Sequence, residues 1–87
     1  MKTSTEERRW TVRSAADLGR ALSGARAERH LTQAALAEET GIHRSYLAAL
    51  ESGDAPMVIE RTLRAFRRMG ATITVSLPVS AEEDPRA

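Results

Sequence analysis

The chain has 87 residues, of which 41% are hydrophobic and 29% charged, and its formal net charge is +1. This length fits one small domain, or one domain that completes its core by dimerising. The absence of cysteine excludes disulfides, thiolate nucleophiles and cysteine-ligated zinc. No stretch approaches the ~18 apolar residues of a membrane span, and residues 1–10 lack the apolar core of a signal peptide, so we expect a cytoplasmic protein.

Arginine supplies 12 of the 13 basic residues. Its guanidinium is always charged and forms a planar fork that fits phosphates and the edge of guanine. Three acidic residues lie in the last seven positions, so the rest of the chain is more basic than the net charge indicates. This distribution is compatible with a nucleic-acid partner, although a GC-rich genome also favours arginine.

Residues 1–13 are expected to form a flexible basic arm. Arg8 and Arg9 stand directly before Trp10. A basic arm of this kind can follow phosphates or enter a groove of DNA. The alternative is a solvated terminus in which Trp10 covers an edge of the core.

The first helix is predicted to begin at Ser14 and to end near Arg29 and His30. Ser14 is a favourable N-cap, and Asp17 takes the third position as an acidic relative of the capping box. The apolar face of this helix is formed by small and aliphatic residues, namely Ala15, Leu18, Leu22 and Ala25. Arg26 falls on the same face, which makes it a charged residue on the buried side.

Residues 31–53 are predicted to form two short helices around a tight turn. Thr32 can cap the first of them, over residues 33–39, because its hydroxyl can accept an otherwise unpaired backbone N–H. Gly41 follows where a left-handed residue is needed, and Ile42 is the apolar residue of the turn. The next helix runs over residues 43–50, with Leu47 and Leu50 facing inward. This arrangement is a helix-turn-helix, whose second helix presents its outer face to the major groove of DNA.

The outer face of the second of these helices is predicted to read the DNA sequence. Arg44 can bond O6 and N7 of guanine together, and Ser45 can bond a base edge or a phosphate. Ala48 and Ala49 can contact a thymine methyl group or allow close approach. Because these alanines carry no polar groups, we expect part of the specificity to come from DNA shape.

Three further residues are candidate DNA contacts with structural alternatives. Gln33, at a helix N-terminus, can donate to a phosphate oxygen, or can be a simple polar residue of the first turn. Tyr46 can donate its hydroxyl to a phosphate, or can be a half-buried ring beside the first helix. His43 can contact a base or simply begin its helix. We expect no metal site at the two histidines, because no cysteine or spaced carboxylate cluster accompanies them.

The stretch from Thr32 to Gly53 resembles the Cro- and lambda-repressor-like helix-turn-helix family, and the resemblance covers roughly residues 14–70. The matching residues are Thr32, Gln33, Leu36, Ala37, Gly41, Ile42, Leu47, Glu51 and Gly53. The resemblance implies a four-helix bundle of the lambda-repressor type. It also implies an ion pair between Arg26 and Glu51, which fixes the angle of the DNA-contacting helix. The alternative is that both are exposed charges.

A fourth helix is predicted over residues 57–69, directly after Pro56. Its core-facing residues are expected to be Val58, Ile59, Leu63, Phe66 and Met69. Its arginines, Arg61, Arg64, Arg67 and Arg68, are expected on the opposite, solvated side. They could also line a dimer groove or meet an acidic partner.

After Gly70 the periodicity changes to two, which predicts a β-strand over residues 71–78 that stops at Pro78. The strand residues are Thr72, Ile73, Thr74, Val75, Ser76 and Leu77. A lone strand needs a partner, and the expected one is the same strand of a second copy, giving an intersubunit two-stranded ribbon. The alternatives are pairing with Trp10–Val12 or with another protein. Residues 79–87 are expected to be a disordered acidic tail.

The resulting fold class is mainly α, a helix-turn-helix domain over residues 14–70 followed by a dimerising strand. This order resembles HipB-like antitoxins, which implies a homodimeric repressor that binds double-stranded operator DNA and a HipA-like kinase toxin. A phage or restriction-system regulator is an alternative of the same class, and a protein-interaction module that does not read DNA is an alternative of another class. No nucleophile elbow, phosphate loop or metal-ligand cluster indicates an enzyme or a cofactor.

Overall fold

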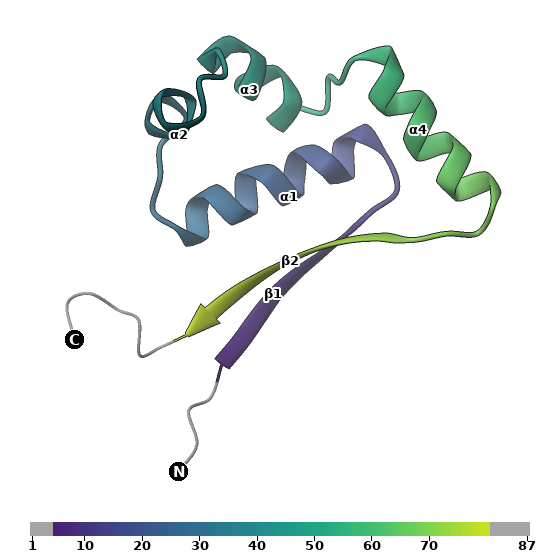
Figure 1. Ribbon diagram of the computed structural model, residues 1–87, viewed down its shortest axis with the longest axis horizontal. Coiled ribbons are helices and arrows are strands. Elements are labelled where there is room, and N and C mark those ends of the chain that lie inside the picture. Colours follow the sequence, from purple (N-terminus) through teal and green to yellow (C-terminus); the bar gives the residue numbers. More distant parts are fainter. Residues whose placement is uncertain (1–4, 81–87) are drawn as a thin grey trace.

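The structure is a computed structural model, and it describes residues 5–80. Its elements in chain order are β1 Thr5–Val12, α1 Ala15–Glu28, α2 Gln33–Thr40, α3 Arg44–Glu51, α4 Met57–Arg68 and β2 Ile73–Ser80. Figure 1 shows α1 running through the middle, with α2 and α3 on one side and the two strands on the other. α4 lies near the N-terminal end of α1. The predicted fold class, a mainly helical bundle with a C-terminal strand, is confirmed.

The helices begin and end where the sequence places capping residues. The Oγ of Ser14 accepts from the backbone N–H of Asp17 at 3.2 Å, and the Asp17 carboxylate accepts from the N–H of Arg13 at 2.9 Å. Thr32 caps α2 in the same way, through the N–H of Ala35 at 3.0 Å. Gly41 ends α2 with a φ of 75°, a left-handed conformation that glycine adopts without a Cβ clash. Local chemistry therefore fixes the turn between α2 and α3.

The predicted partner of the C-terminal strand is wrong. β2 pairs antiparallel with β1 of the same chain, with Val12 opposite Ile73 and Trp10 opposite Val75. The predicted intersubunit ribbon is therefore replaced by the alternative, pairing with the segment around Trp10. The reason is that Trp10 and Val12 share a period of two with β2, so both strands turn an apolar face toward α1.

The predicted flexible arm is also wrong for residues 5–12, because they form β1. Arg8 is held by an ion pair with Glu28 of α1 at 2.9 Å, and Trp10 packs against the core. At the other end, residues 79 and 80 belong to β2 and not to a tail. Residues 1–4 of the predicted arm and 81–87 of the predicted tail lie outside the described residues.

Pro78 lies within β2, although a stop was predicted there. Its carbonyl oxygen accepts a hydrogen bond from Nη2 of Arg29 at 2.9 Å. In an antiparallel pair the N–H and C=O of one residue lie on the same side, so both backbone groups of Pro78 point away from β1. The missing N–H of proline therefore removes no hydrogen bond between the strands. The same alternation makes Thr74 and its partner Thr11 a non-hydrogen-bonded pair.

The core lies between the sheet, α1 and α4. Its buried cluster consists of Val12, Ala21 and Leu63, against which Trp10, Leu18, Ile59, Ile73 and Val75 pack. α4 thus contributes only Ile59 and Leu63. The core positions predicted for Val58 and for Met69, the C-cap residue of α4, are wrong, because each is 70% exposed. Phe66 is 37% exposed, so the chain covers most of its side chain without burying it. α4 meets the bundle over one narrow side, and the rest of its apolar surface faces solvent.

A disulfide between β1 and β2 tests the pairing within one chain. The natural chain has no cysteine, so Thr11→Cys combined with Thr74→Cys introduces one possible bridge. These direct partners form a non-hydrogen-bonded pair, whose Cα atoms lie about 4.5 Å apart, within the reach of a disulfide. We expect oxidation to give a cross-linked species of monomer mass in non-reducing electrophoresis. Thr11→Cys alone is the control, and a mainly dimeric cross-linked product would contradict the intrachain sheet.

Candidate nucleic-acid interface

α3 is oriented by two leucines on one side. Leu47 is only 2% exposed and Leu50 is half-buried. Because successive residues of a helix are 100° apart, Ser45 and the two alanines that follow Leu47 lie on the side opposite these leucines. Arg44 and Ser45, in the first turn of α3, are both exposed. The outer face therefore begins with a guanidinium and a hydroxyl, both open to a partner.

The other candidates on α3 surround this pair. His43 is the exposed N-cap residue and makes no side-chain capping hydrogen bond, and Tyr46 is 43% exposed. Ala48 and Ala49 are half-buried, and their small side chains project little beyond the helix behind the polar first turn. Ile42, predicted as the apolar residue of the turn, keeps 38% of its surface exposed and so fills the turn only in part.

Gln33 makes a contact that sequence reasoning missed. Its side-chain nitrogen donates to a carboxylate oxygen of Glu51 at 3.0 Å, joining the first residue of α2 to the last residue of α3. An amide nitrogen carries two hydrogens, so one N–H remains for the predicted phosphate contact. The separation of 18 residues between these partners left no signal of this contact in the sequence.

Arg26 and Glu51 form a two-pronged ion pair beneath α3. Nε of Arg26 donates to Oε2 of Glu51 at 2.7 Å and Nη2 donates to Oε1 at 2.8 Å. Nη1 donates to the carbonyl oxygen of Leu31 at 2.8 Å, a partner that the sequence did not indicate. The side chains are 19% and 8% exposed, respectively, so the alternative of two exposed surface charges does not hold. One guanidinium therefore joins α1, the turn before α2 and the end of α3.

The charges of this pair stabilise each other. Hydrogen bonding to Glu51 raises the pKa of the Arg26 guanidinium above its ordinary value. The same bonds, with a smaller contribution from Gln33, hold the pKa of the Glu51 carboxyl below its ordinary value of 4.5. Both groups are consequently charged at neutral pH, and the geometry of the network persists through the physiological range.

A close approach of two backbones supports the same arrangement. A Cβ on Gly19 would collide with the carbonyl oxygens of Leu50 and Glu51. Only glycine at this position lets α1 lie directly against the end of α3. The ion pair and this contact together fix the tilt of α3 on α1, and thus the direction in which Arg44 and Ser45 point.

Comparison with known proteins points to the same segment. Residues 22–59 match a family described as helix-turn-helix, a range that includes all of α2 and α3. No curated protein and no solved structure matches the chain. The match supports a Cro- and lambda-repressor-like helix-turn-helix and a role in DNA binding and transcription regulation. Within residues 5–80, no helix is long and apolar enough to cross a membrane.

Breaking the ion pair should cost stability. Glu51→Gln leaves the Arg26 guanidinium without its carboxylate, and we expect the free energy of unfolding at pH 7 to fall by about 2 kcal/mol. Urea denaturation followed by circular dichroism measures this loss. Arg20→Gln is the control, because it removes an exposed ion pair with Asp17 whose arginine side chain is 69% exposed. Equal losses in the two variants would contradict the importance of the partly buried pair.

The loss should also depend on pH. Since the pKa of Glu51 is lowered in the folded chain, its contribution to stability is present above about 4.5, its unfolded value, and is lost as pH falls through the folded value. We therefore expect the wild type and Glu51→Gln to converge in stability below pH 4.5. The same denaturation series at several pH values measures this convergence. A difference that stays constant down to the acid limit would show that the carboxylate charge is not what stabilises the fold.

Proposed function

We propose that the chain is a sequence-specific DNA-binding transcriptional repressor that acts as a homodimer and places α3 in the major groove. The observation that carries the proposal is the helix-turn-helix match over residues 22–59, which coincides with an α3 whose first turn is exposed. Two copies related by a two-fold axis would place their α3 helices in successive grooves of a palindromic operator, about 34 Å apart.

In this proposal the side chains of the interface have separate roles. Arg44 bonds O6 and N7 of a guanine, and Ser45 bonds a neighbouring base edge or phosphate. The helix is positioned on the phosphate backbone of the DNA by Gln33, His43 and Tyr46. The small side chains of Ala48 and Ala49 let α3 approach the bases closely. The outer face of α3 carries only one charged group, so base contacts alone give limited sequence discrimination. We expect DNA shape to contribute further discrimination at base pairs that the protein does not touch.

A protein-interaction module with the same fold is the alternative from another class. The observation that favours it is the absence of polar groups at Ala48 and Ala49. The two functions differ in their response to salt, because a DNA complex built on phosphate contacts weakens steeply as salt rises. Failure to bind any DNA from the region upstream of its own gene would favour the module.

A narrower hypothesis makes the chain the antitoxin of a HipBA-like operon that binds a kinase-like toxin. Its support is the order of a helix-turn-helix bundle followed by a C-terminal strand. The pairing of β2 with β1 removes the dimerising ribbon on which this resemblance partly rested. Co-purification with the product of an adjacent kinase-like gene supports the antitoxin. A neighbouring phage or restriction gene favours a regulator of that kind.

Removing the guanidinium of Arg44 tests the reading role. We expect Arg44→Ala to weaken binding to the preferred upstream fragment by at least about tenfold, since a bidentate guanine contact contributes ~1–3 kcal/mol in each half-site. Fluorescence anisotropy at fixed salt measures the dissociation constant.

Arg8→Ala is the matched control for Arg44→Ala. It removes the same charge from β1, on the opposite side of α1 from α3 (Figure 1). We expect this variant to change the dissociation constant by less than Arg44→Ala does. Equal weakening by both variants would mean that Arg44 contributes only non-specific attraction to the DNA phosphates, and it would contradict a contact between Arg44 and a base.

A further inference from the structure

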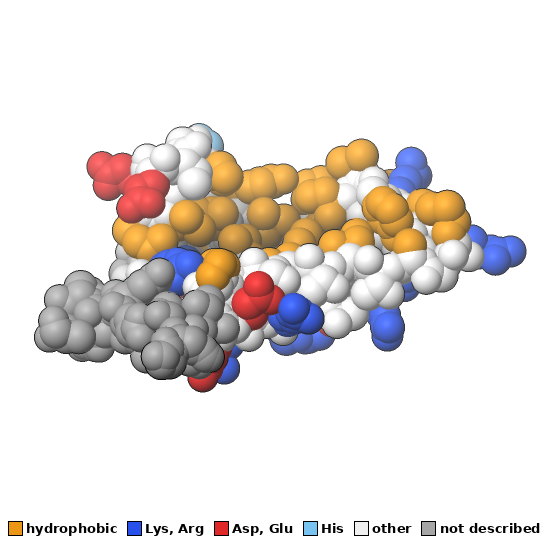
Figure 2. All heavy atoms as spheres, turned by 60° about the horizontal axis from the view of Figure 1, so that its bottom comes forward, with side chains coloured by type: hydrophobic (Ala, Val, Ile, Leu, Met, Phe, Trp, Pro, Cys, Tyr) orange, Lys and Arg blue, Asp and Glu red, His pale blue; other side chains and the backbone are white. Residues whose placement is uncertain are grey.

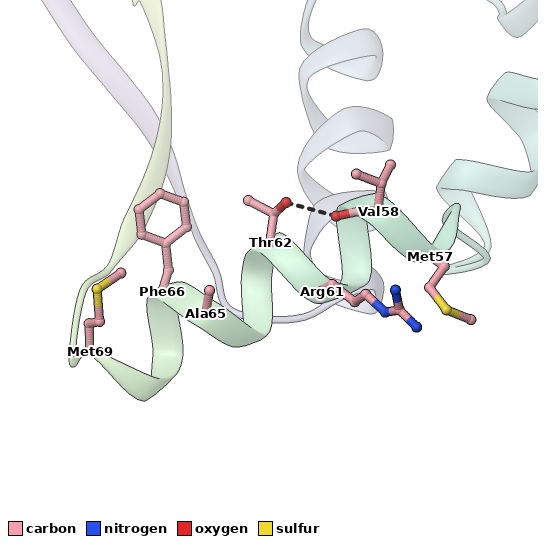
Figure 3. Close-up of a pocket in the computed structure, with 7 residues that line it drawn as sticks. All are labelled: Met57, Val58, Arg61, Thr62, Ala65, Phe66 and Met69. Carbon is pink, nitrogen blue, oxygen red and sulfur yellow. Dashed lines mark hydrogen bonds between the residues drawn. The ribbon is translucent and has the colours of Figure 1, made fainter.

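α4 carries a row of residues that the bundle does not cover. Val58, Thr62, Ala65 and Met69 follow one another at intervals of four, three and four, so they form one stripe along the helix. Val58 and Met69 are each 70% exposed. The hydroxyl of Thr62 donates to the carbonyl oxygen of Val58 at 2.7 Å, which leaves the threonine methyl as its outward group (Figure 3). The whole row is therefore apolar.

Two more side chains widen this row into a surface. Met57 is 62% exposed and Phe66 is 37% exposed, and together with the row they form one open surface along α4. Figure 3 shows Val58, Thr62 and Phe66 projecting to the same side of α4. Figure 2 shows hydrophobic side chains in a band that continues to the end of the molecule formed by α4.

The large apolar side chains of this surface supply about half of the area that a standard interface takes from each partner. At roughly 150–200 Å² for a large side chain, the four large residues of this surface expose on the order of 400 Å². A patch of this size is at the level where apolar surface marks an interaction site. A standard interface takes about 800 Å² from each partner, and the exposed Arg61, Thr62 and Ala65 beside the large residues can supply much of the remainder.

We propose that this surface of α4 binds the same surface of a second copy of the chain, with the two helices antiparallel about a two-fold axis between Thr62 and Ala65. The spacing of four, three and four reads the same in both directions, so each residue of the row can meet another residue of the row across a two-fold axis. One axis then sets Val58 opposite Met69 of the other copy and Thr62 opposite Ala65. The small central pair lets the helices approach closely, and the antiparallel helix dipoles favour this direction.

The charges beside the row determine how the interface responds to substitution. Arg61 and Arg68 lie along one edge of the row, at positions seven residues apart. In the antiparallel dimer, Arg61 of one copy lies near Arg68 of the other at a solvent-exposed rim, where salt screens their repulsion. Replacing one of these arginines by an acidic residue therefore turns a repulsive pair into an attractive one.

This interface rests on the homodimer of the proposed function and identifies where it forms. It also gives a role to the exposed side of α4, which the core contacts of Ile59 and Leu63 leave free. The interface uses neither α3 nor the interstrand pairing of β1 with β2, so dimerisation and DNA contact can be tested separately.

Sedimentation equilibrium of the full chain without DNA is the first test. We expect the wild type to reach twice the 9.5 kDa monomer mass as its concentration rises. Val58→Glu with Met69→Glu should remain monomeric over the same range with an unchanged circular dichroism spectrum, because both positions are exposed. Ala27→Glu with Ala34→Glu, exposed positions on α1 and α2, is the matched control and should dimerise as the wild type does.

Arg68→Glu is the second variant, and it should strengthen the dimer. Each copy then faces Arg61 of the other with a carboxylate, and we expect a dimer dissociation constant a few-fold lower than that of the wild type. A wild type that is monomeric throughout, a dimer that survives Val58→Glu with Met69→Glu, or a weaker dimer in Arg68→Glu would each overturn the interface. A monomeric wild type that still binds DNA through Arg44 would remove the interface and leave DNA binding intact.

Discussion

The partly buried ion pair between Arg26 and Glu51 is the contact on which the rest of the structure depends. α3 has only eight residues, and a helix of this length is not stable alone in water. It is held by Leu47 against the bundle and by Glu51 at its C-terminal end, where the guanidinium of α1 and the amide of α2 meet. The contribution of this pair to the fold is geometric, because the attraction between the two partly buried charges is offset by the hydration that they lose.

The fixed tilt explains how so small a chain can hold the exposed first turn of α3 in one direction. Gly19 lets α1 lie against the backbone at the end of α3, and the ion pair prevents α3 from turning about that contact. Arg44 and Ser45 then extend from the opposite end of the helix, free of other structural roles. A rigid support behind an exposed first turn is what binding to a regular groove requires, because misorientation of the helix would move its first turn away from the bases.

Much of this arrangement could be predicted from local chemistry. Ser14, Thr32 and Gly41 mark helix ends through capping rules that need no tertiary information, and the four helices lie where the apolar period places them. The partner of β2 could not be predicted in the same way. A period of two shows that a strand exists but not what it pairs with, and the polar Glu6–Arg9 stretch hid the strand character of β1. The exposure of Val58 and Met69 was also unpredictable, since an apolar face looks the same whether its own chain or another covers it.

We propose that α3 occupies the major groove with its first turn at a guanine. Methylation protection with dimethyl sulfate tests this most directly, because the reagent attacks N7 of guanine in the major groove and N3 of adenine in the minor groove. With wild-type protein on the bound upstream fragment, we expect protection of guanine N7 in two clusters about one helical turn apart. Protection confined to adenine N3, or bound DNA with every guanine N7 still reactive, would contradict it.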